Sequence, residues 1–553
     1  MYKRQSYTDS TVAPSTTYSY TVSAFNGSGQ ASAQSAPLSV TTPASSTPCT
    51  ASWLISAIAA ANTAGGGTVA LGSGCVYTLT AVNNTADGPT GLPQITRNIT
   101  IQGNGSTITR STASGTPAFR ILDVASGATV TVTGVTMSNG IANDGSHGGG
   151  ALYNHGNLTI TSSTFSGNSN PATSGSSGGA IQNSGTLTVT GCVFTGNTAM
   201  EGGGVFNQNL ATIQQSTFTS NTATIYGGGA LLNAYGTMTV VGSTFVLNTG
   251  PGGGVLDNDT TTNISDSTMY NNTGGTHGGG AIQNFGVVNL TTSTVAGDTS
   301  PYGADIYTYT GNTTTVSSTI VANGLSGSNC GGPGTLVDGG YNLDTAASCG
   351  FSAANHSLSN ANPMLQALAS NGGPTQTMAL SPGSAALDVI PSATAGCGGT
   401  TDQRGISRPQ GPGCEIGAYE LIHNPNDTQP PTTPTGLVAT DSDPGAVALS
   451  WNVSTDNVAV AGYTVVPQRR DPRQHRRQHH QLHRQHRGGA DDLHLCRGGL
   501  RPRRQLLGAV PADHRHHHQR APARAALRTG CLHGDRLHGH QPDHPAGCPG
   551  RCG

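Results

Sequence analysis

The stretch from Gly148 to Ser300 repeats one pattern six times, at intervals of about twenty-five residues. Each copy opens with glycines, runs through a short apolar segment to an asparagine, and continues into a segment rich in Thr, Val, Ile and Leu. The asparagines, which we expect to form a structural ladder, are Asn154, Asn183, Asn207, Asn233, Asn258 and Asn284. A short period filled with strand-forming residues indicates a solenoid whose coils bury their apolar sides against one another.

Alternation within each copy predicts strands and excludes helix. Leu187 and Val189, for example, lie two residues apart, which is the period of a pleated strand with one buried face. Each copy also carries an apolar residue at an equivalent inward position of a strand. We expect these residues to stack in the interior: Phe165, Phe194, Phe218, Phe245, Met269 and Val295. Cys192 holds a small inward position that other copies give to serine. The predicted fold class is all-β, a right-handed parallel β-helix.

Two sets of motifs resemble known families. The Gly-Gly-Ala-Ile openings and Phe-x-x-Asn closings resemble the repeats of polymorphic outer-membrane β-helix adhesins. The strings TDQRGISRP from Thr401 and CEIGAYE from Cys414 resemble the C-terminal portion of the choice-of-anchor Q domain, whose members are β-helix proteins of bacterial surfaces. This second resemblance runs from about Cys49 to Leu421. It implies a scaffold at the cell surface but no particular activity, because β-helices host lyases, hydrolases, epimerases and adhesins.

The flanking segments resemble parts of fibronectin type III domains, and SWLISAIAAAN from Ser52 predicts a short helix that caps the solenoid. The predicted division is 1–43 for the end of one fibronectin domain, 44–48 for a linker, 49–421 for the β-helix (clean repeats 148–300, C-terminal cap 330–421), 422–433 for a linker, and 434–466 for the start of a second fibronectin domain.

The tail at 467–553 differs in chemistry from the rest of the chain, with a sudden abundance of Arg and His and no strand alternation. A one-base frame shift with suitable codons turns 489–518 into a sequence that resembles 12–42. We therefore interpret the tail as a frameshifted, non-native and disordered segment. A basic or metal-binding tail is the alternative.

Composition narrows the classes of function. Only 9% of residues are charged, 80 are glycine, and the net charge is −2, which gives no electrostatic reason to expect nucleic acid as a partner. No apolar run is long enough for a transmembrane segment. The first residues already read as the middle of a strand domain, so we take the N-terminus as truncated. We expect an extracellular or cell-surface monomer without a cofactor.

The cysteines outside the repeats fall into three locally spaced pairs, for which we predict disulfides: Cys49 with Cys75, Cys330 with Cys349, and Cys397 with Cys414. A zinc site is disfavoured because none of the pairs forms a Cys-x-x-Cys knuckle. Cys192 is expected to be a buried, inert thiol, and we predict no metal site.

Candidate ligand-binding residues are few, and no catalytic residue can be assigned. Asp257 and Asp259 stand two apart and could face the same way, as a hydrolase pair would, although turn formation is the alternative. Tyr302, Tyr307 and Tyr309, around Asp305, could form a platform for sugar rings or could pack a loop.

Other charged residues are expected to be structural or too dispersed to form a site. Arg97, Arg110 and Arg120 lie too far apart in sequence to suggest a substrate groove. Asp402, Arg404, Glu415 and Glu420 are expected to form a salt-bridged closing cap.

Regular repeats favour a secreted or surface-bound rod, an adhesin that binds an extracellular glycan or another cell-surface ligand. The alternative is a polysaccharide-active enzyme, a lyase or a glycosidase, with the β-helix face as its groove. An enzyme should carry at least one copy that breaks the repeat with clustered acidic or basic residues.

Overall fold

The computed structural model describes residues 4–9, 12, 16–26, 30–42, 47–143, 145, 147–171, 177–276, 278–302, 305–324, 328–422, 431–443, 446–456 and 460–469. From residue 470 the predicted tail lies outside these residues, so its interpretation as a frameshift stays a prediction.

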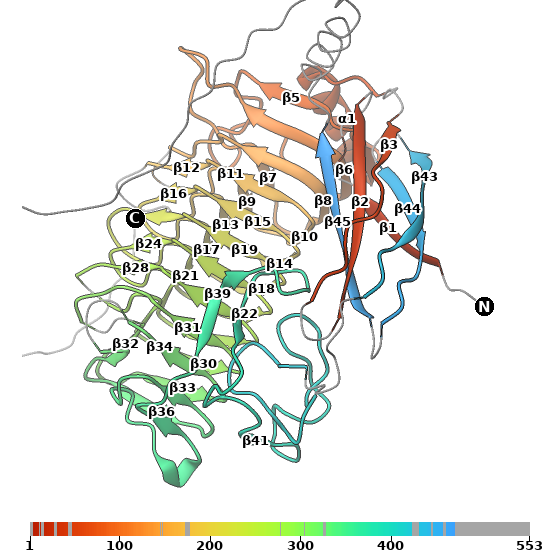
Figure 1. The fold of residues 1–553 in the computed structure, drawn as a ribbon. Coiled ribbons are helices and arrows are strands. Elements are labelled where there is room, and N and C mark those ends of the chain that lie inside the picture. The colour runs from red at the N-terminus through yellow and green to blue at the C-terminus, as the bar shows by residue number, and fades with distance from the viewer. Residues whose placement is uncertain are drawn as a thin grey trace, which may run out of the picture. The chain divides into compact units, whose positions relative to one another are not determined.

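The repeats form a parallel β-solenoid of about nine turns (Figure 1). The turns begin after the N-terminal strands β4 (Gly66–Ala70) and β5 (Val76–Leu79), which pair with β6 (Asn98–Arg110). A regular turn holds four short strands, because corners interrupt the alternation every few residues. Within the clean repeats the pairings between successive turns are parallel and in register, so equivalent residues of the repeat lie directly above one another.

One sheet, called the β9 sheet here, contains the strands that end in the ladder asparagines. Its members are β7 (Leu122–Val124), β9 (Leu152–Asn154), β13 (Ile181–Asn183), β17 (Val205–Asn207), β21 (Leu231–Asn233), β25 (Leu256–Asn258), β29 (Ile282–Asn284), β32 (Ile306–Thr308) and β35 (Cys330–Gly331).

The next two strands of each turn form the opposite wall. The five-residue series is β10 (Asn157–Thr161), β14 (Thr186–Thr190), β18 (Leu210–Gln214), β22 (Thr237–Val241), β26 (Thr261–Ser265), β30 (Val287–Thr291) and β33 (Thr313–Ser317), followed by β36 (Thr335–Asp338). The second series is β11 (Thr164–Ser166), β15 (Val193–Thr195), β19 (Thr217–Thr219), β23 (Thr244–Val246), β27 (Thr268–Tyr270), β31 (Thr294–Ala296), β34 (Ile320–Ala322), β37 (Leu343–Asp344) and β38 (Leu358–Ser359). The long strand β8 (Thr129–Ser138), like β6, spans both series.

A narrow fourth sheet closes each regular turn. It consists of β12 (Ser169–Asn170), β16 (Thr198–Ala199), β20 (Thr222–Ala223), β24 (Thr249–Gly250) and β28 (Thr273–Gly274). Glycine backbones meet here, since a Cβ on Gly179 would lie 2.1 Å from the carbonyl oxygen of Gly203 in the next turn. The glycine openings of the repeat therefore permit the close approach of successive turns.

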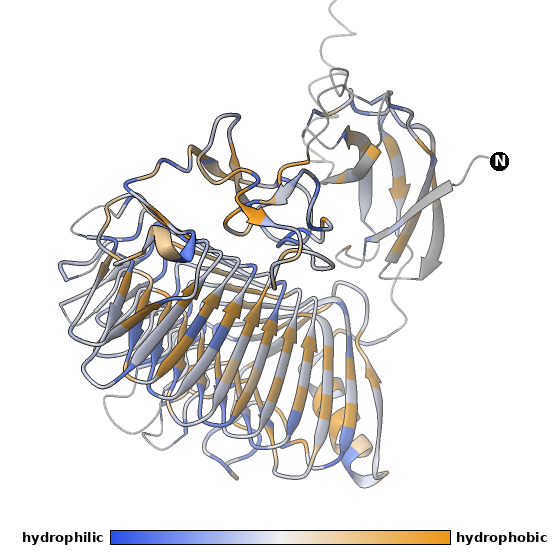
Figure 2. Cartoon of the chain, turned by 90° about the horizontal axis from the view of Figure 1, so that it is seen from below, coloured by the Kyte–Doolittle hydropathy of each residue, from blue (hydrophilic) through white to orange (hydrophobic). Residues whose placement is uncertain are grey.

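The interior is filled by ladders of identical residues. Phe194 stacks on Phe218 with ring centroids 4.4 Å apart, and Phe165 and Phe245 extend the stack on either side. The ladder asparagines are fully buried, and each donates from Nδ2 to the Oδ1 of the next, for example Asn183 to Asn207 over 2.7 Å. Figure 2 shows the resulting alternation of hydrophobic and hydrophilic residues along the strands. Stacking thus satisfies both the apolar and the polar groups of the core.

Helix α1 (Ala51–Thr63) lies at the N-terminal end of the solenoid, as the sequence predicts. The side chain of Thr50 accepts a hydrogen bond from the backbone N–H of Trp53, which caps the first turn. Leu54 and Ile58 are buried in the same core as the first strands. The predicted disulfide between Cys49 and Cys75 ties the start of the helix to β5.

The C-terminal part of the β-helix region packs along the side of the solenoid as well as at its C-terminal end. After the turn η1 (Ala353–Asn355), the chain folds into the hairpin of β39 (Leu365–Ala369) and β40 (Thr377–Leu380), followed by the pair β41 (Ile390–Pro391) and β42 (Gly413–Cys414). Gln403 hydrogen-bonds to the side chains of Thr244 and Thr268, more than 130 residues earlier in sequence. The segment therefore runs back along the solenoid wall instead of covering only its last turn.

Strands from both ends of the described chain contribute to a pair of antiparallel sheets. One sheet has the order β1 (Arg4–Asp9), β44 (Ala446–Asn452), β43 (Thr435–Asp443), and the other β3 (Leu38–Thr41), β2 (Thr17–Asn26), β45 (Val460–Arg469). Tyr20 and Val22 share a core with Leu449 and Trp451. The sequence predicts two separate partial domains. In the structure their strands pair with one another, β1 with β44 and β2 with β45.

The other two predicted disulfides, Cys330 with Cys349 and Cys397 with Cys414, are also formed. Among the described residues, the helices are too short and too polar to traverse a lipid bilayer.

Candidate functional site

The outward face of the β9 sheet is where the repeats differ from one another. Because side chains alternate along a strand, the residues before and after each inward ladder position point away from the core. Those before it are Tyr153, Gln182, Phe206, Leu232, Asp257, Gln283 and Tyr307. Those after it are His155, Ser184, Gln208, Ala234, Asp259, Phe285 and Tyr309. Inward positions are nearly invariant, whereas these outward positions carry acidic, basic, amide and aromatic groups.

A group of carboxyls lies at the β25 level of this face. Asp257 and Asp259 flank the ladder residue Asn258 and so both point outward, as the sequence suggests. Asp257 is nearly buried, and burial, followed by the charges of Asp259 and Glu201, raises its pKa well above the usual range. Asp259 is exposed, and its pKa is raised by partial burial and by Glu201. Burial and the neighbouring carboxyls thus favour the protonated form of Asp257 more than that of an exposed carboxyl.

An aromatic cluster, consisting of Phe285, Tyr302, Tyr307 and Tyr309, adjoins these carboxyls at the β29 and β32 levels. Phe285 and Tyr309 stack with ring centroids 4.0 Å apart. Tyr307 meets Tyr309 edge-on at 4.9 Å and Tyr302 at 6.1 Å. Tyr302 is 56% exposed and Phe285 is 38% exposed, so ring surface remains open to solvent. The structure thus brings together three of the sequence candidates, Tyr302, Tyr307 and Tyr309, on one aromatic surface.

Asp305, another sequence candidate, does not belong to that surface. It is fully buried, and its Oδ1 lies 3.4 Å from the backbone nitrogen of Asp298. Burial and the charge of Asp298 raise the pKa of Asp305 well above its ordinary value. The expectation that Asp305 could contact a ligand is therefore corrected, because residue 305 precedes β32 at an inward position.

Several residues of this site escape analysis of the sequence alone. Gln283 and Phe285 complete the aromatic and polar surface, and Glu201 joins the carboxyls from an earlier turn. The signal that could have found the first two is positional, since each adjoins a ladder position on the outward side. Glu201 carries no such signal, because it lies in a corner ahead of the glycines.

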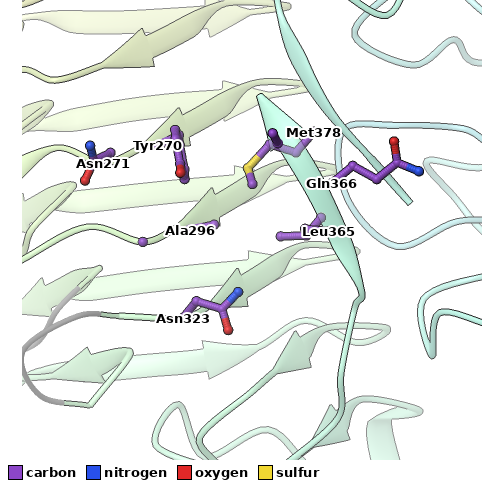
Figure 3. A pocket seen from close by; sticks show the side chains of 9 residues that line it. Tyr270, Asn271, Ala296, Asn323, Leu365, Gln366 and Met378 are labelled. Atoms are coloured by element: carbon purple, nitrogen blue, oxygen red, sulfur yellow. The ribbon is translucent and has the colours of Figure 1, made fainter. Parts of the chain in front are cut away.

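A separate cavity of about 300 Å³ lies between the solenoid wall and the hairpin β39–β40 (Figure 3). It is lined by Tyr270, Asn271, Ala296, Asn323, Leu365, Gln366 and Met378, among others. No carboxyl, imidazole or guanidinium group lines it. The cavity therefore offers volume but no acid–base chemistry.

The charged residues of the C-terminal region form structural ion pairs. Asp402 and Arg404 are joined over 2.7 Å, and Arg408 bonds to Glu420 over 3.1 Å, all with nearly buried side chains. Burial and the adjacent Glu420 raise the pKa of Glu415 to about 9, so one proton is held between the two carboxyls. These contacts stabilise the fold of the C-terminal region, and none of these charged groups is exposed as a reactive group.

The fold is that of a right-handed parallel β-helix protein. Polar and aromatic side chains lie on the outward face of its β9 sheet. Residues 73–249 match the family described as the right-handed beta helix region.

Two curated relatives share a short segment with this chain. Chitinase Chi52 of Paenibacillus xylanexedens is 56% identical over 39 residues, which cover 7% of this chain and 8% of that protein. Chitinase A1 of Niallia circulans is 54% identical over 39 residues, 7% of this chain and 6% of that protein. The chain thus spans less than a tenth of the length of either chitinase.

Among solved structures, the A-module of the mannuronan C-5 epimerase AlgE6 from Azotobacter vinelandii is similar over 53% of this chain and 94% of that module. The sequence identity is 13% and the TM-score is 0.20.

Proposed function

We propose that this protein is an extracellular glycan-binding β-helix that lays a polysaccharide along the outward face of the β9 sheet. The observation that carries the proposal is the stack of Phe285 on Tyr309, in which Phe285 is exposed, beside Asp257 and Asp259. Aromatic faces pack against the C–H faces of sugar rings, and adjacent carboxyls bond to ring hydroxyls. Pockets that recognise polar ligands combine these two kinds of group.

The shape of the face favours a polymer over a single sugar. From β9 to β32 the sheet crosses six strand spacings, or about 29 Å, with polar side chains along much of that length. Gln182 donates to Gln208 over 3.1 Å across two of these turns. Amides, carboxyls and rings on either side of the apolar cluster of Phe206, Leu232 and Ala234 suit repeated contacts along a chain of sugars.

An extracellular location is part of the proposal. Three disulfides lie in one chain, and such bonds persist in oxidising compartments. The short matches to two chitinases add support, since chitin is itself a polysaccharide outside the cell.

Affinity electrophoresis of the full chain in gels containing different soluble polysaccharides tests the proposal. We expect retardation by at least one polymer, and a loss of retardation in the variants Phe285→Ala and Tyr302→Ala. Tyr235→Ala is the matched control, because Tyr235 is 75% exposed but lies outside the aromatic cluster. Equal retardation of the cluster variants and the control would overturn the assignment of this face.

A further inference from the structure

The cavity beside the hairpin β39–β40 lies where one column of outward side chains changes abruptly in size. Tyr270, Ala296 and Ala322 occupy the same outward position in three successive turns of the second strand series. A ring is therefore followed by two methyl groups, which leaves a hollow next to the ring. Leu365 and Met378 of the hairpin close the hollow from the other side (Figure 3). The cavity thus has an aromatic wall and an aliphatic wall.

The position of the aromatic wall depends on the corner that follows β31. Gly297 has a φ of 69°, and a Cβ at this residue would lie 3.2 Å from Cε2 of Tyr270. Because glycine has no side chain, the ring can lie against the backbone of the corner. Tyr270 is half-buried there and lines the cavity.

Two asparagine amides line the cavity at the corners one turn before and one turn after Gly297. Asn271 and Asn323 have φ values of 56° and 58°, a region that asparagine tolerates. Their backbone N–H groups donate to the carbonyl of Ala296 and to the hydroxyl of Thr345. Their side-chain amides form no hydrogen bond with any other residue that the structure describes. Both amides are therefore available to a ligand.

Forming the corner does not require these amides. Gly297 makes the same corner one turn after Asn271 without a side chain. By contrast, the next residue, Asn272, donates its amide to the carbonyl of Phe245 and to Asp298. The ladder amides are thus used by the fold, whereas the amide of Asn271 is not.

The hairpin is fixed to the solenoid, so the cavity exists before any ligand binds. The hydroxyl of Thr244 donates to the carbonyl of Gln376 over 2.6 Å, and the hydroxyl of Thr375 donates to the carbonyl of Gly242 over 2.8 Å. Met378 is buried against the solenoid wall. A preformed cavity loses little conformational entropy on binding.

The chemistry of the lining restricts the ligand. None of the residues that line the cavity is charged, so a phosphate, a carboxylate or an ammonium group would lose its hydration there without an ionic partner. The volume of about 300 Å³ lies at the lower end of the range for small-molecule sites. These properties favour a small, uncharged ligand over a polymer segment.

We propose that this cavity binds a single neutral sugar ring, at a carbohydrate site that is separate from the β9 sheet and does not depend on it. Sugar hydroxyls donate and accept hydrogen bonds, as do the amides of Asn271 and Asn323. The C–H face of the ring packs on Tyr270, with the aliphatic wall on its other side. A wholly apolar ligand would leave both amides without partners.

Saturation-transfer NMR of the full chain with the methyl glycosides of glucose, galactose, mannose and N-acetylglucosamine tests the proposal. We expect at least one of them to bind with a dissociation constant of about 1 mM, as for a ligand of about a dozen non-hydrogen atoms. Asn271→Gly removes an amide but suits the backbone of the corner, and should weaken binding about 5-fold. Ala367→Trp, at an exposed position of the cavity lining, should abolish binding.

Asn360→Gly is the matched control, because Asn360 is exposed, has a φ of 53° and lies outside the cavity. Denaturant titration of each variant shows that it is folded. Binding that survives Ala367→Trp, or an equal loss in Asn271→Gly and Asn360→Gly, would overturn the proposal. No saturation transfer to any of the four glycosides would also overturn it, and would leave the proposed glycan binding by the β9 sheet untouched. Loss of binding in Phe285→Ala would place the sugar on the β9 sheet instead.

Discussion

The inner and outer sides of the β9 sheet belong to the same strands but follow opposite rules. Inward, Asn207, Asn233 and Asn258 repeat one residue, because each amide bonds to the amides of the turns before and after it. Outward, Asp257 and Gln283 occupy the same register position one strand apart and differ in charge and size. Stacking between turns therefore restricts the residue types at the inward positions. The residue types at the outward positions can vary without loss of stability.

The difference between inward and outward positions is tested most strongly by removing one aromatic ring from the interior stack. Phe218 lies between Phe194 and Phe245 and is fully buried. We expect Phe218→Ala to lower the free energy of unfolding by about 3–5 kcal/mol, through lost burial and a residual cavity. Tyr235→Ala, at an exposed ring, should change it by less than about 0.5 kcal/mol. Denaturant titration measures both values, and equal losses would refute the distinction between the two sides.

The polar ladder should be nearly as sensitive. Asn207 accepts from Asn183 over 2.7 Å and donates to Asn233 over 2.8 Å. Asn207→Ala leaves buried amide groups of its neighbours with fewer partners, at a cost of about 2–4 kcal/mol. Its outward neighbour Gln208→Ala is the matched control, with an expected change under about 1 kcal/mol. A ladder variant as stable as the control would show that the amide bonds do not support the coil.

The regular part of the fold could be predicted because its cause is local and repeated. Period, alternation and the positions of Asn183 and Phe194 suffice to place strands and to choose the inward face. Asp257 and Asp259 could be suspected because they flank a ladder position.

Other parts depend on contacts that no local pattern encodes. Asp87 reaches His155 from an irregular loop, and Gln403 reaches Thr268 from a distant segment. Each of these contacts joins residues with no shared sequence motif. This is why the contact between Asp87 and His155 could not be predicted from the sequence.

A third prediction concerns pH. Asp298 ends a second ladder of buried asparagines, and burial raises its pKa to about 7 from an unfolded value near 3.9. The folded protein then binds more protons than the unfolded chain between these values. Its free energy of unfolding therefore falls as pH rises from about 4 to about 7. Asp298→Asn, which continues the ladder with an amide, should stabilise the protein by roughly 1–3 kcal/mol at pH 8 and by little at pH 4.

Thermal unfolding of Asp298→Asn and of the unchanged protein across this pH range is the measurement. A stabilisation that is the same at pH 4 and pH 8 would argue against a buried carboxyl that holds its proton.

The smallest change in the free energy of unfolding is expected for a buried residue that is replaced by the residue found at the same position in other repeats. Cys192 is buried at the position held by Ser216 in the next turn, and burial raises the pKa of its thiol to about 11. Cys192→Ser should change the free energy of unfolding by less than about 1 kcal/mol. In the native protein the thiol should resist alkylation. Rapid alkylation of Cys192 under native conditions would contradict its burial in the interior of the solenoid.

The central claim, that the outward face of the β9 sheet binds a polysaccharide, is tested most directly by the double variant Phe285→Ala/Tyr302→Ala in affinity electrophoresis. Both rings are exposed, so the variant should unfold at the same denaturant concentration as the unchanged protein. We predict that it loses most of its retardation by the polymer that the unchanged protein binds. Undiminished retardation, in a protein of unchanged stability, would contradict the account.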